Sequence, residues 1–105
     1  MIIASKQSQV SEIKKYIEEN SDKYEKLYVF GVCTKAEATS EDYLDLAVKT
    51  IDDDLADDDE ALLDLFTAIS HITEGKFNIF MLNGLNAIDI PYEHEGELIY
   101  EKTGK

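Results

Sequence analysis

The stretch LYVFGVCTKAEATSEDYLDLAV, residues 27–48, decides the fold of this chain. It opens within a short β-branched and aromatic run, Lys26–Val32, which predicts a buried strand. It closes within Tyr43–Lys49, where side chains alternate and so face opposite sides of a strand. One side is expected to carry Leu44, Leu46 and Val48, and the other Tyr43, Asp45 and Ala47. The sequence therefore predicts two strands joined by a polar loop, with the carboxylate of Asp45 facing away from the core.

Helical spacing on both sides of this stretch predicts two helices. The first is expected from Gln7 to about Lys23, with apolar residues at Val10, Ile13, Ile17 and Tyr24. The second is expected over Asp59–Thr73, with an apolar stripe formed by Leu62, Leu65, Phe66, Ile69 and Ile72. Glu74–Lys76 is typical of a helix stop.

The last third of the chain predicts at least one more strand. Phe77–Leu82 is nearly all apolar, which favours a central position in the sheet. Leu85–Ile90 fits a short helix or a strand, and Leu98–Tyr100 is a short final apolar segment. The order of elements predicts an α/β (α+β) fold, in which a small mixed β-sheet has helices packed on one face.

Length and composition indicate one domain spanning residues 1–105. A second domain would leave neither half enough core, and 44% hydrophobic residues suffice for one packed interior. No apolar run approaches the roughly 20 residues of a membrane span. Met1–Ser5 lacks the features of a secretory signal, and Cys33 is the lone cysteine, so we expect a cytoplasmic protein without membrane association.

The net charge of −13 is concentrated in the second part of the chain. Residues 1–35 have a net charge of +1 and residues 36–105 one of −14, and all ten cations are lysines. Proteins bind the phosphates of nucleic acids mainly through Lys and Arg. Because acidic residues outnumber the lysines here, we do not expect the chain to bind nucleic acid on its own. The acidic part serves either solubility or the docking of a basic partner.

The sequence of residues 27–48 resembles the signature of the DNA polymerase beta-like nucleotidyltransferases, above all their minimal bacterial and archaeal branch. That signature is Gly-Ser, ten residues, then Asp-any-Asp; here Gly31-Val32 precedes ten residues and Tyr43-Leu44-Asp45. Further matching segments are Val29–Gly31, Glu37–Thr39, Asp45–Val48 and Glu95–Glu101. The resemblance covers most of the chain and implies a nucleotidyltransferase-like fold.

The resemblance also implies that the catalytic motif has degenerated. In the family, two aspartates and a third on the next strand serve divalent ions, and the motif serine contacts phosphate. Val32 replaces that serine, Tyr43 replaces the first aspartate, and Asp45 remains. Asn78 is the best match to the third acid, with Asp89 as the alternative. We therefore expect no cofactor, or Mg²⁺ at Asp45 if activity persists.

Four residues are candidates for residual nucleotide contact. Gly31, Val32, Lys35 and Tyr43 match positions near the phosphates, and Lys35 corresponds to a family arginine that touches phosphate. Structural roles compete with these assignments. Asp45 could be solvated or paired with Lys35, and Tyr43 could pack as an ordinary aromatic residue or stack on a base.

Other conspicuous residues predict no further site. Asp52–Glu60 holds seven acids in nine residues but lacks the EF-hand pattern, so we expect a solvated loop whose last acids favour a helix N-terminus. Cys33 has no CxxC partner and is interpreted as a small buried or loop residue. His71 and His94 lack metal-ligand spacing.

The sequence favours an inactive nucleotidyltransferase-like module that acts through protein interactions or regulation. Minimal members of the family often work with an all-helical partner, as in toxin–antitoxin pairs, and a basic partner would suit the acidic part of this chain. The alternatives are a residual metal-dependent nucleotidyltransferase centred on Asp45 and a metal-independent nucleotide sensor. Self-association is compatible with all three.

Overall fold

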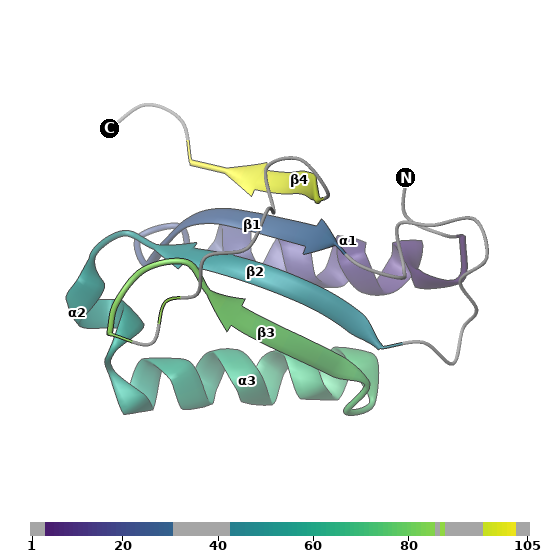
Figure 1. The fold of residues 1–105 in the computed structure, drawn as a ribbon. Coiled ribbons are helices and arrows are strands. Elements are labelled where there is room, and N and C mark those ends of the chain that lie inside the picture. Colours follow the sequence, from purple (N-terminus) through teal and green to yellow (C-terminus); the bar gives the residue numbers. More distant parts are fainter. Residues whose placement is uncertain (1–3, 31–42, 86, 88–95, 103–105) are drawn as a thin grey trace.

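The computed structural model describes residues 4–30, 43–85, 87 and 96–102 (Figure 1). The helices and strands follow in the order α1 (Ala4–Glu19), β1 (Tyr24–Phe30), β2 (Leu44–Thr50), α2 (Asp53–Ala56), α3 (Asp59–Thr73), β3 (Phe77–Met81) and β4 (Glu97–Glu101). The four strands form one sheet in the order β3-β2-β1-β4. Strand β1 is antiparallel to β2 and β4, whereas β2 and β3 are parallel. The fold is thus α+β with a mixed sheet.

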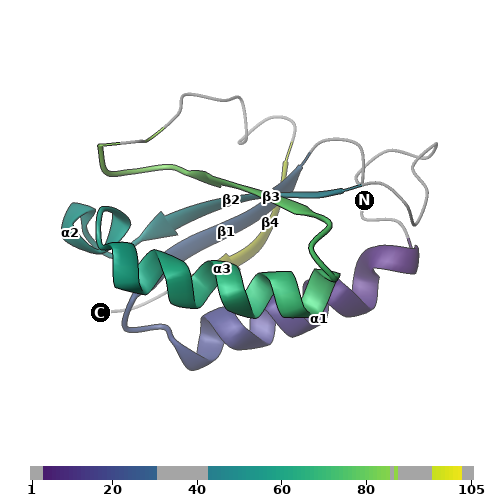
Figure 2. The same cartoon turned by 90° about the horizontal axis from the view of Figure 1, so that it is seen from below.

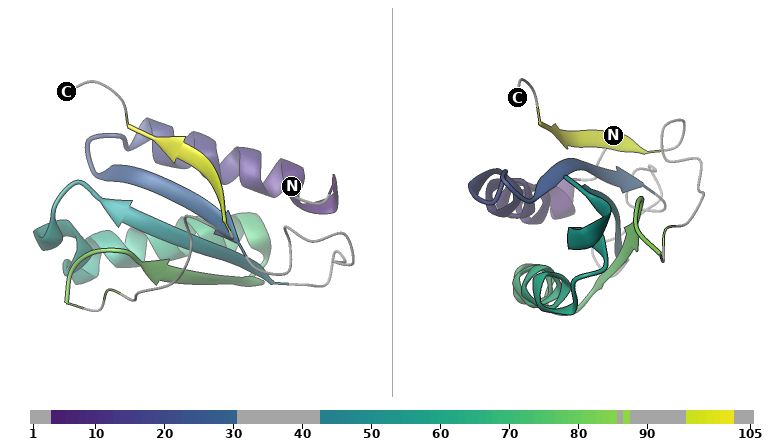
Figure 3. Two further views of the ribbon diagram at one scale, coloured as in Figure 1. Left: turned by 45° about the horizontal axis from the view of Figure 1, so that its top comes forward. Right: turned by 90° about the vertical axis from the view of Figure 1, so that its left-hand side faces the viewer.

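Both long helices lie on the same face of the sheet, as Figures 2 and 3 show. The core forms between them and that face; its fully buried members include Ile13, Ile17, Leu27, Val29, Leu44, Leu46, Val48, Leu65 and Ile69. Alternation along β2 sends Leu44 and Leu46 into this core and turns Asp45 to the other side. We call that other side the second face of the sheet, which carries Tyr28, Phe30, Asp45, Ala47, Asn78 and Phe80.

The first helix ends earlier than helical spacing predicts. It stops at Glu19, and Tyr24 begins β1, so the assignment of Tyr24 to a helical stripe was wrong. Asn20 causes the early stop: its side-chain amide donates to the Tyr16 carbonyl at 2.8 Å. The backbone then turns, with the Lys23 N–H donating to the Asn20 carbonyl at 2.9 Å. Tyr24 is nonetheless buried in the core, now from the strand.

Strand β3 lies at an edge of the sheet, so its predicted central position was wrong. Its apolar character has another cause, because α3 covers one of its faces and Phe77 and Ile79 pack against the core there. The bounds predicted for α3 are confirmed, and Glu74 ends it in the left-handed conformation, with φ of 57°. Phe66, placed in the core stripe by its spacing, is instead 37% exposed.

The acidic run forms two helix starts rather than one loop. Asp52 caps α2 by accepting from the Leu55 N–H at 2.9 Å, and Asp58 caps α3 by accepting from the N–H groups of Glu60 and Ala61. The expected placement of the last acids at a helix N-terminus is confirmed, and the short α2 is an addition. Carboxylates favour these positions because they satisfy unpaired N–H groups and the helix dipole.

The turn after β3 is fixed against the end of β2. The Asn83 side-chain oxygen Oδ1 accepts from the Thr50 N–H at 3.1 Å, and its Nδ2 donates to the Thr50 hydroxyl at 2.9 Å and to the Asp53 carboxylate at 3.2 Å. Gly84 follows with φ of 89°, and a Cβ there would lie 2.6 Å from the Ala56 Cβ. The described helices are too short or too polar to cross a membrane.

Candidate functional site

Three strands bring their second-face residues together around Asp45. In the sheet register, Phe30 of β1 and Asn78 of β3 flank Asp45 of β2 directly. Residues paired in this way point to the same face. The Asp45 side chain is half-buried and that of Asn78 is exposed. Asp45 therefore lies between an aromatic ring and an amide at the end of the sheet where β2 and β3 begin.

A direct hydrogen bond joins the two polar groups. The Asn78 amide nitrogen donates to the Asp45 carboxylate oxygen Oδ1 at 2.9 Å. The bond crosses from β3 to β2 between residues 33 positions apart in the chain. A bond from a neutral donor to a carboxylate is stronger than one between neutral groups. The bond therefore orients the Asp45 carboxylate toward Asn78.

Tyr43 stands at the entrance of β2, two residues before Asp45. Its side chain is 51% exposed, while the intervening Leu44 is fully buried in the core. A phenol at this position supplies an aromatic ring and a hydroxyl in place of a carboxylate. The described part of the site thus offers one carboxylate, one amide and one phenol.

Aromatic side chains cover the second face next to Asp45. The rings of Phe30 and Phe80 lie on opposite sides of β2, with centroids 5.6 Å apart and planes tilted by 50°. Ala47 lies beneath them and is fully buried, and Tyr28 beside it is 7% exposed. Sequence patterns alone do not single out this group. The only hint in the sequence is that Tyr28 and Phe30 alternate along β1. They can be aligned with Phe80 of β3 only once the strand register is known.

The remaining predicted site residues lie outside the described residues. These are Gly31, Val32, Lys35 and Asp89, so their assigned contacts stay predictions. The same holds for the alternative ion pair between Lys35 and Asp45, and for Cys33 and His94. Within residues 4–30, 43–85, 87 and 96–102, no three His, Cys, Asp or Glu side chains gather closely enough to hold a metal ion.

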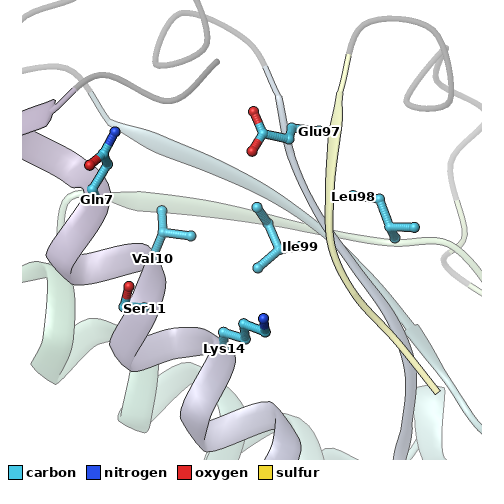
Figure 4. A pocket seen from close by; sticks show the side chains of 7 residues that line it. All are labelled: Gln7, Val10, Ser11, Lys14, Glu97, Leu98 and Ile99. Carbon is cyan, nitrogen blue, oxygen red and sulfur yellow. The ribbon is translucent and has the colours of Figure 1, made fainter. Parts of the chain in front are cut away.

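A separate pocket lies between α1 and β4 and has a volume of about 430 Å³. Figure 4 shows Val10 and Lys14 of α1 facing Ile99 of β4 across it, while Leu98 lies on the side of β4 away from the helix. Because α1 covers the core face of the sheet, this pocket is on the opposite side of the sheet from Asp45. It therefore does not form part of the candidate site.

Chains from several solved toxin–antitoxin structures share this architecture. A chain from a double aspartate-to-glutamate mutant of the MntA-HpeT toxin–antitoxin matches with a TM-score of 0.65 and 15% identity, over 89% of this chain and 73% of that one. A chain from the tri-AMPylated HEPN toxin of Shewanella oneidensis in complex with MNT antitoxin matches with a TM-score of 0.62 and 18% identity, over 92% and 73%. A toxin–antitoxin with AMP-PNP gives 0.65 and 16%, over 89% and 73%.

These similarities establish the fold. The chain has a nucleotidyltransferase-like α+β fold, as the resemblance of residues 27–48 predicted. No family model and no curated protein matches the sequence.

Proposed function

We propose that this chain is a nucleotidyltransferase-like module that does not transfer nucleotides and that acts by binding a protein partner. The observation that carries the proposal is the hydrogen bond from the Asn78 amide to Asp45. In this bond a neutral donor engages Oδ1 of the carboxylate that, by resemblance, would ligate the catalytic metal.

The chemistry of the described groups does not suit Mg²⁺. This ion prefers near-octahedral oxygen ligation and is usually anchored by one or two carboxylates. Here Asp45 is the only carboxylate of the described site, and Asn78 presents an N–H donor to it. A metal that used Oδ1 of Asp45 would have to displace that donor, and Tyr43 carries no carboxylate that could serve as a second anionic ligand.

The charge of the chain also opposes a bound nucleoside triphosphate without metal. A net charge of −13 repels phosphates unless local cations or metal ions screen it. Removing a single electrostatic contributor from a catalytic site costs about 10²–10³ in rate. By resemblance, Tyr43 stands where one carboxylate is expected, and Asn78 is the best match to a second. The net charge and the replaced carboxylates both support the proposed loss of transfer activity.

The solved toxin–antitoxin complexes support the partner-binding part of the proposal. One of the similar structures pairs an antitoxin with a HEPN toxin. By analogy, we propose that this chain keeps a partner-binding surface and works in a toxin–antitoxin or comparable regulatory pair. The acidic residues 36–105 of this chain would raise the rate of association with a basic partner more than they would raise the affinity of the complex.

Two measurements test the two parts. Purified protein is incubated with labelled ATP, CTP, GTP or UTP and Mg²⁺ or Mn²⁺, with the product of an adjacent gene as acceptor. We expect no transfer above that of the Asp45→Asn variant; transfer that requires Asp45 would overturn the inactivity. Size-exclusion chromatography of the co-expressed pair tests the binding, and a chain that elutes alone would contradict the partner role.

A second candidate is metal-independent nucleotide binding, which the exposure of Tyr43 favours because a half-exposed ring beside Asp45 could stack on a base. It predicts that nucleotides raise the melting temperature without metal. A ligand at 100 times its Kd would add about 2.7 kcal/mol of stability. Tyr43→Ala should abolish the shift, and a shift that survives this change would exclude stacking on Tyr43.

A further inference from the structure

The outer flank of α3 carries large apolar side chains in contact with solvent. Leu63 is 63% exposed and Phe66 is 37% exposed. Beside them lies a groove of about 520 Å³, lined by Phe66, Thr67, Ser70, His71 and Phe77. We call this surface, with Leu63 at its end, the α3–β3 groove. Adjacent apolar side chains exposed together often mark an interaction site.

Helical geometry explains why α3 has this second apolar flank. Leu65 and Ile69 are fully buried and face the core. Leu63, Phe66 and Ser70 follow one another at spacings of three and four, so they share a different side of the helix. Phe66 and Ser70 of that side line the groove together with Phe77 of β3, and β3 runs alongside α3 in Figure 1. The exposed flank is therefore a different side of the helix from the one that carries Leu65 and Ile69.

The edge strand next to the groove lacks the usual protection. Strand β3 has the sequence FNIFM, without a charged residue, and within the described residues it pairs only with β2. The opposite edge strand, β4, has the sequence ELIYE, with a glutamate at each end. Proteins commonly guard an edge with charge because an apolar edge invites association. The contrast marks the β3 edge as the one suited to a partner.

Acidic residues bracket the apolar flank at both ends. Asp59 and Glu60 precede Leu63 by about one helical turn, and Glu74 follows Ser70 by one turn. Residues 50–75 contain nine acids and no lysine or arginine, and Lys76 is the one cation between α3 and β3. A second copy of the chain would bring like charges together across this surface, whereas a cationic segment would be attracted.

We infer that the α3–β3 groove binds a protein segment whose apolar side is flanked by lysine or arginine residues. Leu63 and Phe66 contact the apolar side of the segment, and Asp59, Glu60 and Glu74 attract its cations. The inference rests on the proposed function, since it assumes that the domain acts through a partner. It adds the surface used and the chemistry of what is bound.

A defined peptide tests the assignment without knowledge of the natural partner. The probe is a short fluorescent amphipathic helix made of leucine and lysine, and its counterpart carries glutamate in place of lysine. Fluorescence anisotropy with the full chain should detect the lysine peptide alone. The variant Leu63→Ser/Phe66→Ser should bind about tenfold more weakly, as expected for loss of central apolar contacts.

Leu85→Ser/Leu98→Ser is the matched control, because these leucines are 89% and 45% exposed on other parts of the surface. It should bind as the unmodified chain does, and circular dichroism confirms that both variants fold. Equal affinity of the two variants, equal binding of the glutamate peptide, or no binding of the lysine peptide would each overturn the inference. The proposed function is judged separately by the transfer assay and the co-expressed pair.

Discussion

Replacing Asn78 by aspartate probes the polar pair at the centre of the candidate site. Asn78→Asp removes the 2.9 Å hydrogen bond to Asp45 and sets a second carboxylate against the first. The lost bond is worth about 1 kcal/mol at an exposed position. Two charges about 4 Å apart repel by about 1 kcal/mol in water and about 4 kcal/mol at an effective dielectric constant of 20. Because Asn78 is exposed, the lower end applies, and we expect a loss of about 2 kcal/mol in unfolding free energy at pH 7.

The pH dependence separates repulsion from simple loss of a hydrogen bond. As pH falls from 7 toward 4, one carboxylate of the variant takes up a proton and can donate to the other, so the destabilisation should shrink. Asn78→Ala, which adds no charge, should cost at most about 1 kcal/mol, with little dependence on pH. The exchange Asp45→Asn/Asn78→Asp restores one amide and one carboxylate and should return most of the stability.

Urea denaturation at pH 7 and pH 4 measures these differences through the unfolding midpoint at constant slope. The interpretation fails if Asn78→Asp and Asn78→Ala are equally stable at pH 7, or if the exchanged pair is no more stable than Asn78→Asp alone. Either result would show that the two side chains are not energetically coupled.

Two further perturbations test the fold that supports the site. Burial, and to a smaller extent the neighbouring Tyr16, raises the pKa of Tyr24 well above its usual value of 10. Because the folded-state pKa exceeds the unfolded one, the contribution of Tyr24 to stability should be constant at neutral pH and fall above about pH 10. In thermal melts, Tyr24→Phe should flatten that fall. Gly84→Ala should cost about 2 kcal/mol, because φ is 89° and the added Cβ would meet Ala56 at 2.6 Å. Gly75→Ala shares a positive φ but has open space, so it should cost about 1 kcal/mol; equal losses at both glycines would contradict the steric explanation.

Local periodicity was enough to predict the elements that position Asp45. Alternation along Tyr43–Lys49 placed Asp45 on the face opposite the core, and helical spacing predicted the bounds of α3 correctly. Both signals reside within a few neighbouring residues, because side-chain direction in a strand or helix repeats over two or about four positions. The fold class followed from the order of these elements and from the resemblance.

Contacts between distant segments could not be predicted in the same way. The bond between Asp45 and Asn78 depends on the parallel register of β2 and β3, and the edge position of β3 depends on which strand pairs with it. Phe66 has the spacing of a core residue, yet it is 37% exposed and lines a surface groove with Phe77 of β3. Tyr24 fits helical spacing, yet Asn20 ends the helix first. The first three cases depend on packing between distant segments, whereas the end of α1 depends on a local side-chain hydrogen bond that helical spacing does not reveal.

Isothermal titration of Mn²⁺ into the unmodified chain tests the central proposal most directly. Since the Asn78 amide already engages the Asp45 carboxylate and Tyr43 supplies no second one, we predict no binding heat. The Tyr43→Asp/Asn78→Asp variant, which gains two carboxylates beside Asp45, should bind Mn²⁺ and serves as the positive control. Binding by the unmodified chain that disappears in Asp45→Asn would contradict the account.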